Sequence, residues 1–143
     1  MRTLALTLTL TLAACGSPDG SPADASPDAD AAVASDAAPL PVAHPLTPAE
    51  LSAALAQKDF LLINVHTPDA GEIPGTDIHL PYTDVPAIAA YLGQDLGVKA
   101  VLYCRSNTMA DLALQDLLPL GYTNLYYLDG GMNAWTAAGY PLE

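Results

Sequence analysis

Cys104 occupies a position where a sulfur nucleophile could act. The apolar run of residues 98–103 predicts a buried strand that ends at this cysteine, and a helix is expected over about residues 108–118. In parallel α/β sheets, ligands bind at the carboxyl ends of strands, beside helix N-termini that favour anions. A thiolate is therefore favoured, and its chemistry is nucleophilic attack, with the resulting anion held by nearby backbone amides. The residues predicted to bind that anion are Arg105, Ser106, Asn107, Thr108 and Met109.

An inert role for Cys104 is the alternative, because free cysteines are among the most buried residues of proteins. Its place at a strand end argues against this role. The other cysteine, Cys15, is expected to be lipidated, as described below, which leaves Cys104 without a disulfide partner. A lone thiol in an oxidising compartment is a liability unless it is used. We therefore interpret Cys104 as the catalytic nucleophile.

Residues 40–143 are long enough to form one hydrophobic core. The predicted elements are, in order, a helix that starts at residues 47–50 with a Thr cap, a strand at 60–65, a short strand at 78–80, a helix at 85–92, a strand at 98–103, a helix at about 108–118, a strand at 124–128 and a short helix that carries Trp135. Buried strands that alternate with helices predict an α/β fold, a small parallel β-sheet flanked by helices on both faces. The core residues expected in the helix over 108–118 are Met109, Leu112, Ala113, Leu117 and Leu118.

Three segments of this region carry patterns that occur together in one family. They are residues 62–66 (LINVH) followed by 73–75 (IPG), residues 103–110 (YCRSNTMA) and residues 128–135 (LDGGMNAW). They resemble the L-I-D-V-R … H-I-P-G-A segment, the C-R-S-G-x-R-S loop and the L-x-G-G-x-x-x-W ending of the rhodanese-like domain family of single-domain sulfurtransferases. The match runs in unbroken order over about residues 46–143, and the three motifs together are specific.

The resemblance implies a rhodanese-like fold and a sulfurtransferase in which Cys104 forms a persulfide. Sulfane sulfur would come from thiosulfate or a persulfide donor and pass to a thiol or cyanide, with Arg105 orienting the anion and no cofactor. A second interpretation stays open: a catalytically weak or inactive module that acts as a persulfide carrier, a redox sensor or a protein-binding domain. No metal site is expected, because the chain has two cysteines and three scattered histidines.

The cysteine loop departs from the family motif at two positions. Asn107 stands where Gly is usual, and because Asn tolerates left-handed backbone we expect the loop shape to be kept. Met109 replaces the closing Arg, so Arg105 is left as the cation of the loop. Phosphatase relatives close a longer Cys-x₅-Arg loop, whereas the corresponding residue here is Ala110. A phosphatase or an arsenate reductase is therefore not expected.

The first buried strand also departs from the family pattern. Asn64 and His66 stand where Asp and Arg are usual, which suggests a neutral hydrogen bond in place of an ion pair. Glu72 replaces a His in a shortened segment before Ile-Pro-Gly, so a more open or more acidic entrance is expected. His66 lies at a strand end near the site and is a candidate for influencing Cys104.

The charge of the chain excludes several classes of partner. Lys and Arg number 4 against 16 Asp and Glu, a formal net charge of −12. Nucleic-acid binding and polybasic attachment to anionic lipid both need clustered cations, so neither is expected.

The first 14 residues predict an export signal rather than part of the fold. Arg2 precedes a short Leu/Thr/Ala run, and small residues lead to Cys15. Residues 12–16 (LAACG) resemble a bacterial lipobox, which implies a lipoprotein signal peptide over 1–14 and diacylglycerol on Cys15. The alternative is an ordinary secretory signal with an incidental cysteine. With Gly16 after the cysteine, the resemblance implies a periplasmic domain anchored in the outer more than the inner membrane.

Residues 15–39 comprise the lipidated cysteine and an Ala/Pro/Asp/Ser-rich linker. This segment has too few apolar side chains to offset the entropy cost of folding, so we expect disorder. Its predicted role is to tether the domain of residues 40–143 to the membrane, and neutral filler is the alternative.

Overall fold

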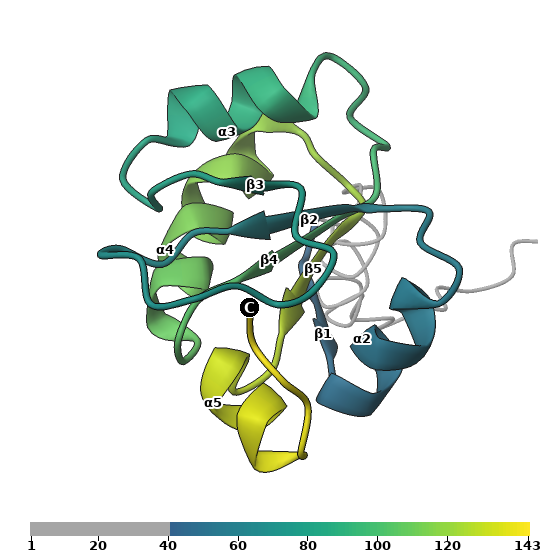
Figure 1. The fold of residues 1–143 in the computed structure, drawn as a ribbon. Helices are drawn as coiled ribbons and strands as arrows, with labels where there is room; N and C mark the ends of the chain where they lie inside the picture. The colour runs from purple at the N-terminus through teal and green to yellow at the C-terminus, as the bar shows by residue number, and fades with distance from the viewer. Residues whose placement is uncertain (1–40) are drawn as a thin grey trace, which may run out of the picture. The chain divides into compact units, whose positions relative to one another are not determined.

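The fold is described from a computed structural model, which describes residues 41–143 (Figure 1). The predicted signal peptide over 1–14, the lipidation site Cys15 and the linker over 15–39 lie outside the described residues. Within residues 41–143, no helix has the length and apolar character needed to cross a bilayer.

Five parallel strands form one sheet in the order β1-β5-β4-β2-β3. Their bounds are His44–Leu46 (β1), Leu61–Asn64 (β2), Ile78–His79 (β3), Ala100–Tyr103 (β4) and Leu125–Leu128 (β5). Every residue of the central strand β4 is buried, as expected of a strand covered on both faces. In the register between β2 and β4, Asn64 lies opposite Tyr103, so both strands end at the same edge of the sheet. The predicted parallel α/β sheet is confirmed.

Helices cover both faces of this sheet. Apolar residues of α3 (Val85–Leu92) and α4 (Thr108–Leu117) pack with Ile63 and Leu102 on one face. Those of α2 (Pro48–Leu55) and α5 (Gly131–Ala137) pack with Leu62 and Val101 on the other (Figure 1). Because side chains alternate along a strand, β2 and β4 each supply both cores. The predicted flanking of the sheet on both faces is confirmed.

The start of α2 follows the pattern read from the sequence. The Glu50 N–H donates to Thr47 Oγ1 at 3.2 Å, and the Thr47 N–H donates to Glu50 Oε2 at 2.8 Å. This capping box satisfies N–H groups that the first helical turn leaves unpaired. The backbone hydrogen bond from Thr47 lowers the pKa of Glu50, which favours its ionised form.

The structure differs from the sequence-based expectations in two places. His44–Leu46, for which no element is expected from the sequence, forms the edge strand β1 against β5. Pro45 is tolerated there because an edge strand has one side without a partner. Leu112, expected in the core, is 42% exposed. The buried residues of α4 are instead Ala110, Ala113, Leu114 and Leu117, which follow helical spacing on one face, and a 3₁₀ turn at Leu118–Leu120 ends the segment.

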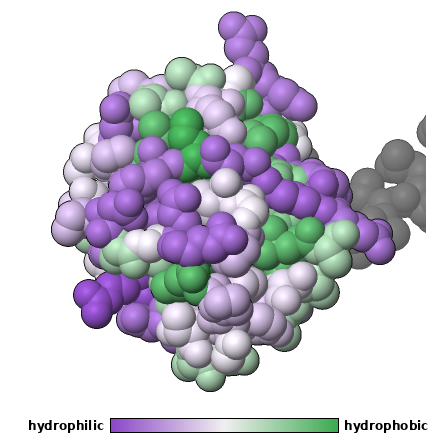
Figure 2. Space-filling view, in the orientation of Figure 1, coloured by the Kyte–Doolittle hydropathy of each residue, from purple (hydrophilic) through white to green (hydrophobic). Residues whose placement is uncertain are grey.

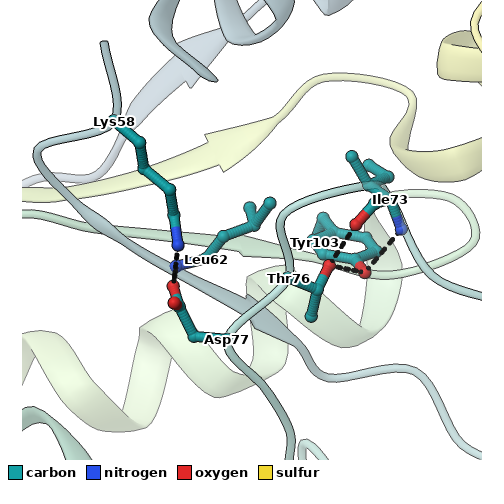
Figure 3. A network of polar contacts seen from close by, with 6 residues as sticks. All are labelled: Lys58, Leu62, Ile73, Thr76, Asp77 and Tyr103. Carbon is teal, nitrogen blue, oxygen red and sulfur yellow. Dashed lines mark hydrogen bonds and ion pairs between the residues drawn. The ribbon is translucent and has the colours of Figure 1, made fainter. Parts of the chain in front are cut away.

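Polar contacts fasten the segment between β2 and β3 to the sheet (Figure 3). The buried Tyr103 hydroxyl accepts from the Ile73 N–H at 3.0 Å and lies 2.6 Å from Thr76 Oγ1. The carboxylate of Asp77 accepts from the Leu62 N–H at 2.7 Å and pairs with Lys58. Burial raises the pKa of the Tyr103 hydroxyl, so it stays neutral. This segment is therefore held from both β2 and β4.

Tyr103→Phe is expected to lower the free energy of unfolding by about 1–3 kcal/mol, because the Ile73 N–H loses its acceptor in a buried place. Urea unfolding followed by circular dichroism measures the change. Tyr126→Phe is the matched control, since Tyr126 is only partly buried on β5. Equal stability of the two variants would show that the Tyr103 hydroxyl contributes nothing.

The viewed face of the molecule carries apolar residues as separate patches between polar ones (Figure 2). The large apolar side chains exposed among the described residues are Val42, Tyr91, Leu96, Leu112 and Leu120. Scattered exposure of this kind is normal for a soluble domain and does not by itself mark a binding surface.

Candidate active site

Cys104 is the first residue after β4, and α4 begins at Thr108. The strand–cysteine–helix arrangement expected from the sequence is therefore present. The cysteine side chain is 1% exposed and packs in the core formed with α3 and α4. Its thiol donates to the Ser106 carbonyl oxygen at 3.3 Å. The sulfur thus lies just beneath the loop that follows it.

The carbonyl groups of the loop are held by the start of α5. The Met132 N–H donates to the Cys104 oxygen at 2.9 Å, and the Asn133 N–H donates to the Arg105 oxygen at 3.0 Å. Gly131 has a positive φ of 59°, and a Cβ there would lie 2.4 Å from the Cys104 oxygen. Only glycine fits this contact. The second glycine of the 128–135 motif, Gly131, therefore allows the cysteine loop to pack directly against the start of α5.

The N–H groups of the loop have a different arrangement. Among residues 41–143, the backbone N–H groups of Arg105 to Met109 donate no hydrogen bond to the protein. They lead into the first turn of α4, where unpaired N–H groups and the helix dipole attract negative charge. A loop with its carbonyl groups engaged and its N–H groups unpaired is suited to hold an anion at the cysteine.

Asn107 corrects one expectation. Its φ of −108° and ψ of −22° are right-handed, so the left-handed backbone anticipated at this position is absent. Its side chain instead donates to Asp129 Oδ1 at 2.8 Å and accepts from the Gly130 N–H at 2.8 Å. The side chain therefore binds the loop to the turn between β5 and α5. The backbone N–H of Asn107 remains available for the predicted role of binding an anion.

The other residues predicted to bind substrate lie around the same loop. Ser106 and Thr108 are exposed, whereas Met109 is partly buried against the apolar core. Arg105 is exposed. Within residues 41–143, both lysines form ion pairs with aspartates, whereas the guanidinium of Arg105 forms none. Arg105 is therefore available to an external anion.

A cavity of about 340 Å³ adjoins the loop on the side of Arg105. Its lining residues are Ala70, Arg105, Met132, Asn133, Thr136 and Leu142. Leu142 is placed there because the chain end folds back: Glu72 and Glu143 exchange two backbone hydrogen bonds, and Trp135 Nε1 donates to the Pro141 oxygen at 2.8 Å. Sequence reasoning missed this wall, although the apolar Tyr140 and Leu142 close behind Trp135 were a signal for it.

His66 and Asn64 lie at the end of β2, beside the cysteine loop. Asn64 is fully buried, and its Oδ1 accepts from the His66 backbone N–H at 3.0 Å. Its Nδ2 donates to the Gly71 oxygen at 3.2 Å. The neutral hydrogen bond expected between the two residues exists, but it reaches the backbone of His66 and not its ring. Burial lowers the pKa of His66, and the nearby charge of Arg105 lowers it further, which favours the neutral imidazole.

No three His, Cys, Asp or Glu side chains of residues 41–143 gather closely enough to hold a metal ion.

The model of one protein family, the rhodanese-like domain, matches residues 47–138. The chain belongs to the rhodanese-like domain family. The matched residues include the cysteine loop and the Gly-Gly turn that contacts it, so the site described above lies within the rhodanese-like domain.

Solved structures agree on the fold. A rhodanese-related protein from Thermoplasma volcanium superposes with a TM-score of 0.59 at 22% identity, over 70% of this chain and 97% of that one. A thiosulfate sulfurtransferase from Pseudomonas aeruginosa superposes with a TM-score of 0.59 at 26% identity, over 73% of this chain and 20% of that one.

An uncharacterized protein of Synechocystis is 42% identical over 50 residues, which are 35% of this chain and 28% of that protein. The chain thus spans under a third of the length of the last two relatives.

Proposed function

We propose that this rhodanese-like domain is a sulfurtransferase that carries sulfane sulfur on Cys104. The Cys104 thiolate attacks the outer sulfur of thiosulfate, the S–S bond of thiosulfate breaks, and sulfite leaves with the bonding electron pair. An acceptor thiolate or cyanide then attacks the terminal sulfur of the Cys104 persulfide. The persulfide S–S bond breaks, the Cys104 thiolate is restored, and the acceptor leaves as a persulfide or thiocyanate. The two steps balance without a cofactor or an added oxidant.

One observation carries this proposal. The cysteine lies under a loop whose unpaired N–H groups and single free cation are arranged for an anionic sulfur group. These donors are fixed before the reaction, because α5 and Asn107 hold the loop from behind. Preorganised donors of this kind stabilise developing negative charge without reorganisation, which is the largest single contribution in many enzymes. Arg105 orients the donor, since Met109 offers no second charge.

The cavity beside Arg105 supports a thiol acceptor. Its volume of about 340 Å³ lies at the lower end of the range for sites of small organic ligands. Its lining combines the Arg105 guanidinium with polar Asn133 and Thr136 and with apolar Leu142. A small thiol that carries an acidic group fits this lining.

Sulfite release tests the proposal. The full chain is mixed with thiosulfate, first without an acceptor and then with cyanide or a small thiol. We expect about one sulfite per chain without an acceptor, and continuous release when an acceptor is added. No release above the level of buffer would contradict the sulfurtransferase proposal.

A non-catalytic role is the second candidate, and one observation favours it. Cys104 is 1% exposed and its thiol donates to the Ser106 oxygen, so an external acceptor has little access to the sulfur. A persulfide carrier, a redox sensor or a protein-binding module would have such a protected sulfur. One sulfite per chain, with no further release for any small acceptor, is the result that would favour this role.

We also propose that Cys15 carries the lipid that anchors the domain on the periplasmic side of the outer membrane. The short apolar run, the small residues before Cys15 and Gly16 after it support this proposal. Two or more acyl chains give stable anchoring. Radiolabelled palmitate that is incorporated into the wild type and not into Cys15→Ser is the expected result, and equal labelling of both would contradict it.

A further inference from the structure

His66 lies just beyond the end of β2, beside the cysteine loop. Asn64 lies opposite Tyr103 in the register of β2 with β4, and the Val65 N–H donates to the Tyr103 oxygen at 2.8 Å. Continued by one and two residues, this register places Val65 beside Cys104 and His66 beside Arg105. The imidazole is therefore placed at the edge where the cysteine loop and Arg105 lie.

The protein holds the backbone of His66 but does not satisfy its ring. Asn64 and His79 both bind backbone atoms of His66. The side chain is about nine-tenths buried, and its Nδ1 is enclosed without a hydrogen-bond partner among residues 41–143. An imidazolium carries a proton on both nitrogens, so this site gives the charged form no protein acceptor at Nδ1. Buried polar groups without a partner are rare and point to a role outside the fold itself.

The charges that face His66 come from three directions. Arg105 in the cysteine loop and His79 on β3 oppose a positive charge on the ring, whereas Asp69 in the loop after β2 favours it. Burial opposes the positive charge on the ring most strongly, and together these effects lower the pKa of His66. The free site therefore holds one permanent cation, Arg105, and one neutral base beside it. An anion bound at Arg105 would offset both the repulsion and the loss of solvation.

We propose that binding of an anionic sulfur donor beside Arg105 is coupled to uptake of one proton by His66. The inference rests on the proposed function, because it concerns the donor site of that reaction. The proton comes from solvent and no bond of the donor is made or broken. A bound anion raises the pKa of a neighbouring imidazole. Donor affinity therefore increases as the pH falls, first through the pKa of His66 in the donor complex and then through its lower pKa in the free protein. Above and below that window the affinity is constant.

Binding without turnover tests this coupling. The probe is thiosulfate, which stays a dianion over the range used, and the protein is the full chain with Cys104→Ser, in which no persulfide forms. Calorimetry measures the Kd between about pH 5.5 and 8.5, where an ordinary histidine titrates. We expect binding roughly tenfold tighter at the acidic end, which corresponds to a shift of about one pH unit in the titration of one group.

Four further substitutions, each made in the Cys104→Ser chain, identify the group: two at His66, one at His44 and His79→Asn. His66→Asn should bind thiosulfate with a Kd that does not change with pH, near that of the parent at alkaline pH. His66→Arg carries a permanent cation and should bind tightly at every pH. His44→Asn is the matched control, because His44 is exposed on the far edge strand β1, and it should keep the pH dependence of the parent.

The possible outcomes separate the two levels of the proposal. A pH dependence that persists in His66→Asn, or that disappears only in His79→Asn, would overturn the coupling to His66. Binding that is equally strong at all pH values in the parent chain would also overturn the coupling to His66, but it would be consistent with the proposed donor site. Absence of thiosulfate binding at every pH in the parent chain and in His66→Arg would contradict the donor site itself.

Discussion

Cys104→Ser is expected to reduce sulfur transfer from thiosulfate to cyanide by about a thousandfold or more, as loss of a covalent nucleophile does in other enzymes. A serine hydroxyl is almost fully protonated at neutral pH and forms no persulfide, whereas the loop and Arg105 remain to bind the donor. Steady-state thiocyanate formation measures the effect.

Cys15→Ser is the matched control, because it removes the other cysteine of the chain and should keep full transfer. Transfer by Cys104→Ser at a rate near that of Cys15→Ser would show that sulfur passes through another group.

Gly131→Ala is expected to lower the rate of sulfur uptake by about a hundredfold, the cost of moving a catalytic group by about 1 Å. The added Cβ would lie 2.4 Å from the Cys104 oxygen and 2.7 Å from the Ser106 oxygen. Both are backbone atoms, so the cysteine loop must shift away from α5 and its anion-binding N–H groups must move with it. Single-turnover sulfite release measures the rate.

Gly139→Ala separates this clash from ordinary backbone strain. Gly139 also has a positive φ, of 87°, but nothing lies within 4 Å of its added Cβ. We expect it to cost about 1–2 kcal/mol of stability through the left-handed backbone and to leave sulfur uptake unchanged. Uptake by Gly131→Ala at the rate of Gly139→Ala would mean that the loop does not depend on its contact with α5.

Local patterns were enough to predict most of the fold. Thr47 and Glu50 marked the start of α2, and short apolar runs marked β2, β4 and β5 because these strands are buried on both faces. β1 was missed for a physical reason: three residues that include a proline become a strand only by pairing with β5. Leu112 was misplaced because an apolar residue within a helix shows its burial only once the face toward the sheet is known.

The site could be predicted only in part, and the limit was sequence separation. Cys104 was found because the strand before it and the helix after it are both local signals. The contacts that shape its loop come from elsewhere: Asn107 reaches Asp129, and Met132 and Asn133 hold the loop carbonyl groups. The motif alone predicts a left-handed backbone at Asn107, whereas in the structure its side chain binds Asp129 and the Gly130 N–H.

Direct detection of the persulfide is the most decisive measurement for the central claim. The full chain is treated with thiosulfate, freed of small molecules and analysed by mass spectrometry as an intact chain and as peptides. The account predicts a gain of one sulfur atom on the peptide that contains Cys104, its loss on addition of cyanide, and no gain in Cys104→Ser. A wild-type chain that gains no sulfur, or that gains it equally in Cys104→Ser, would contradict the account.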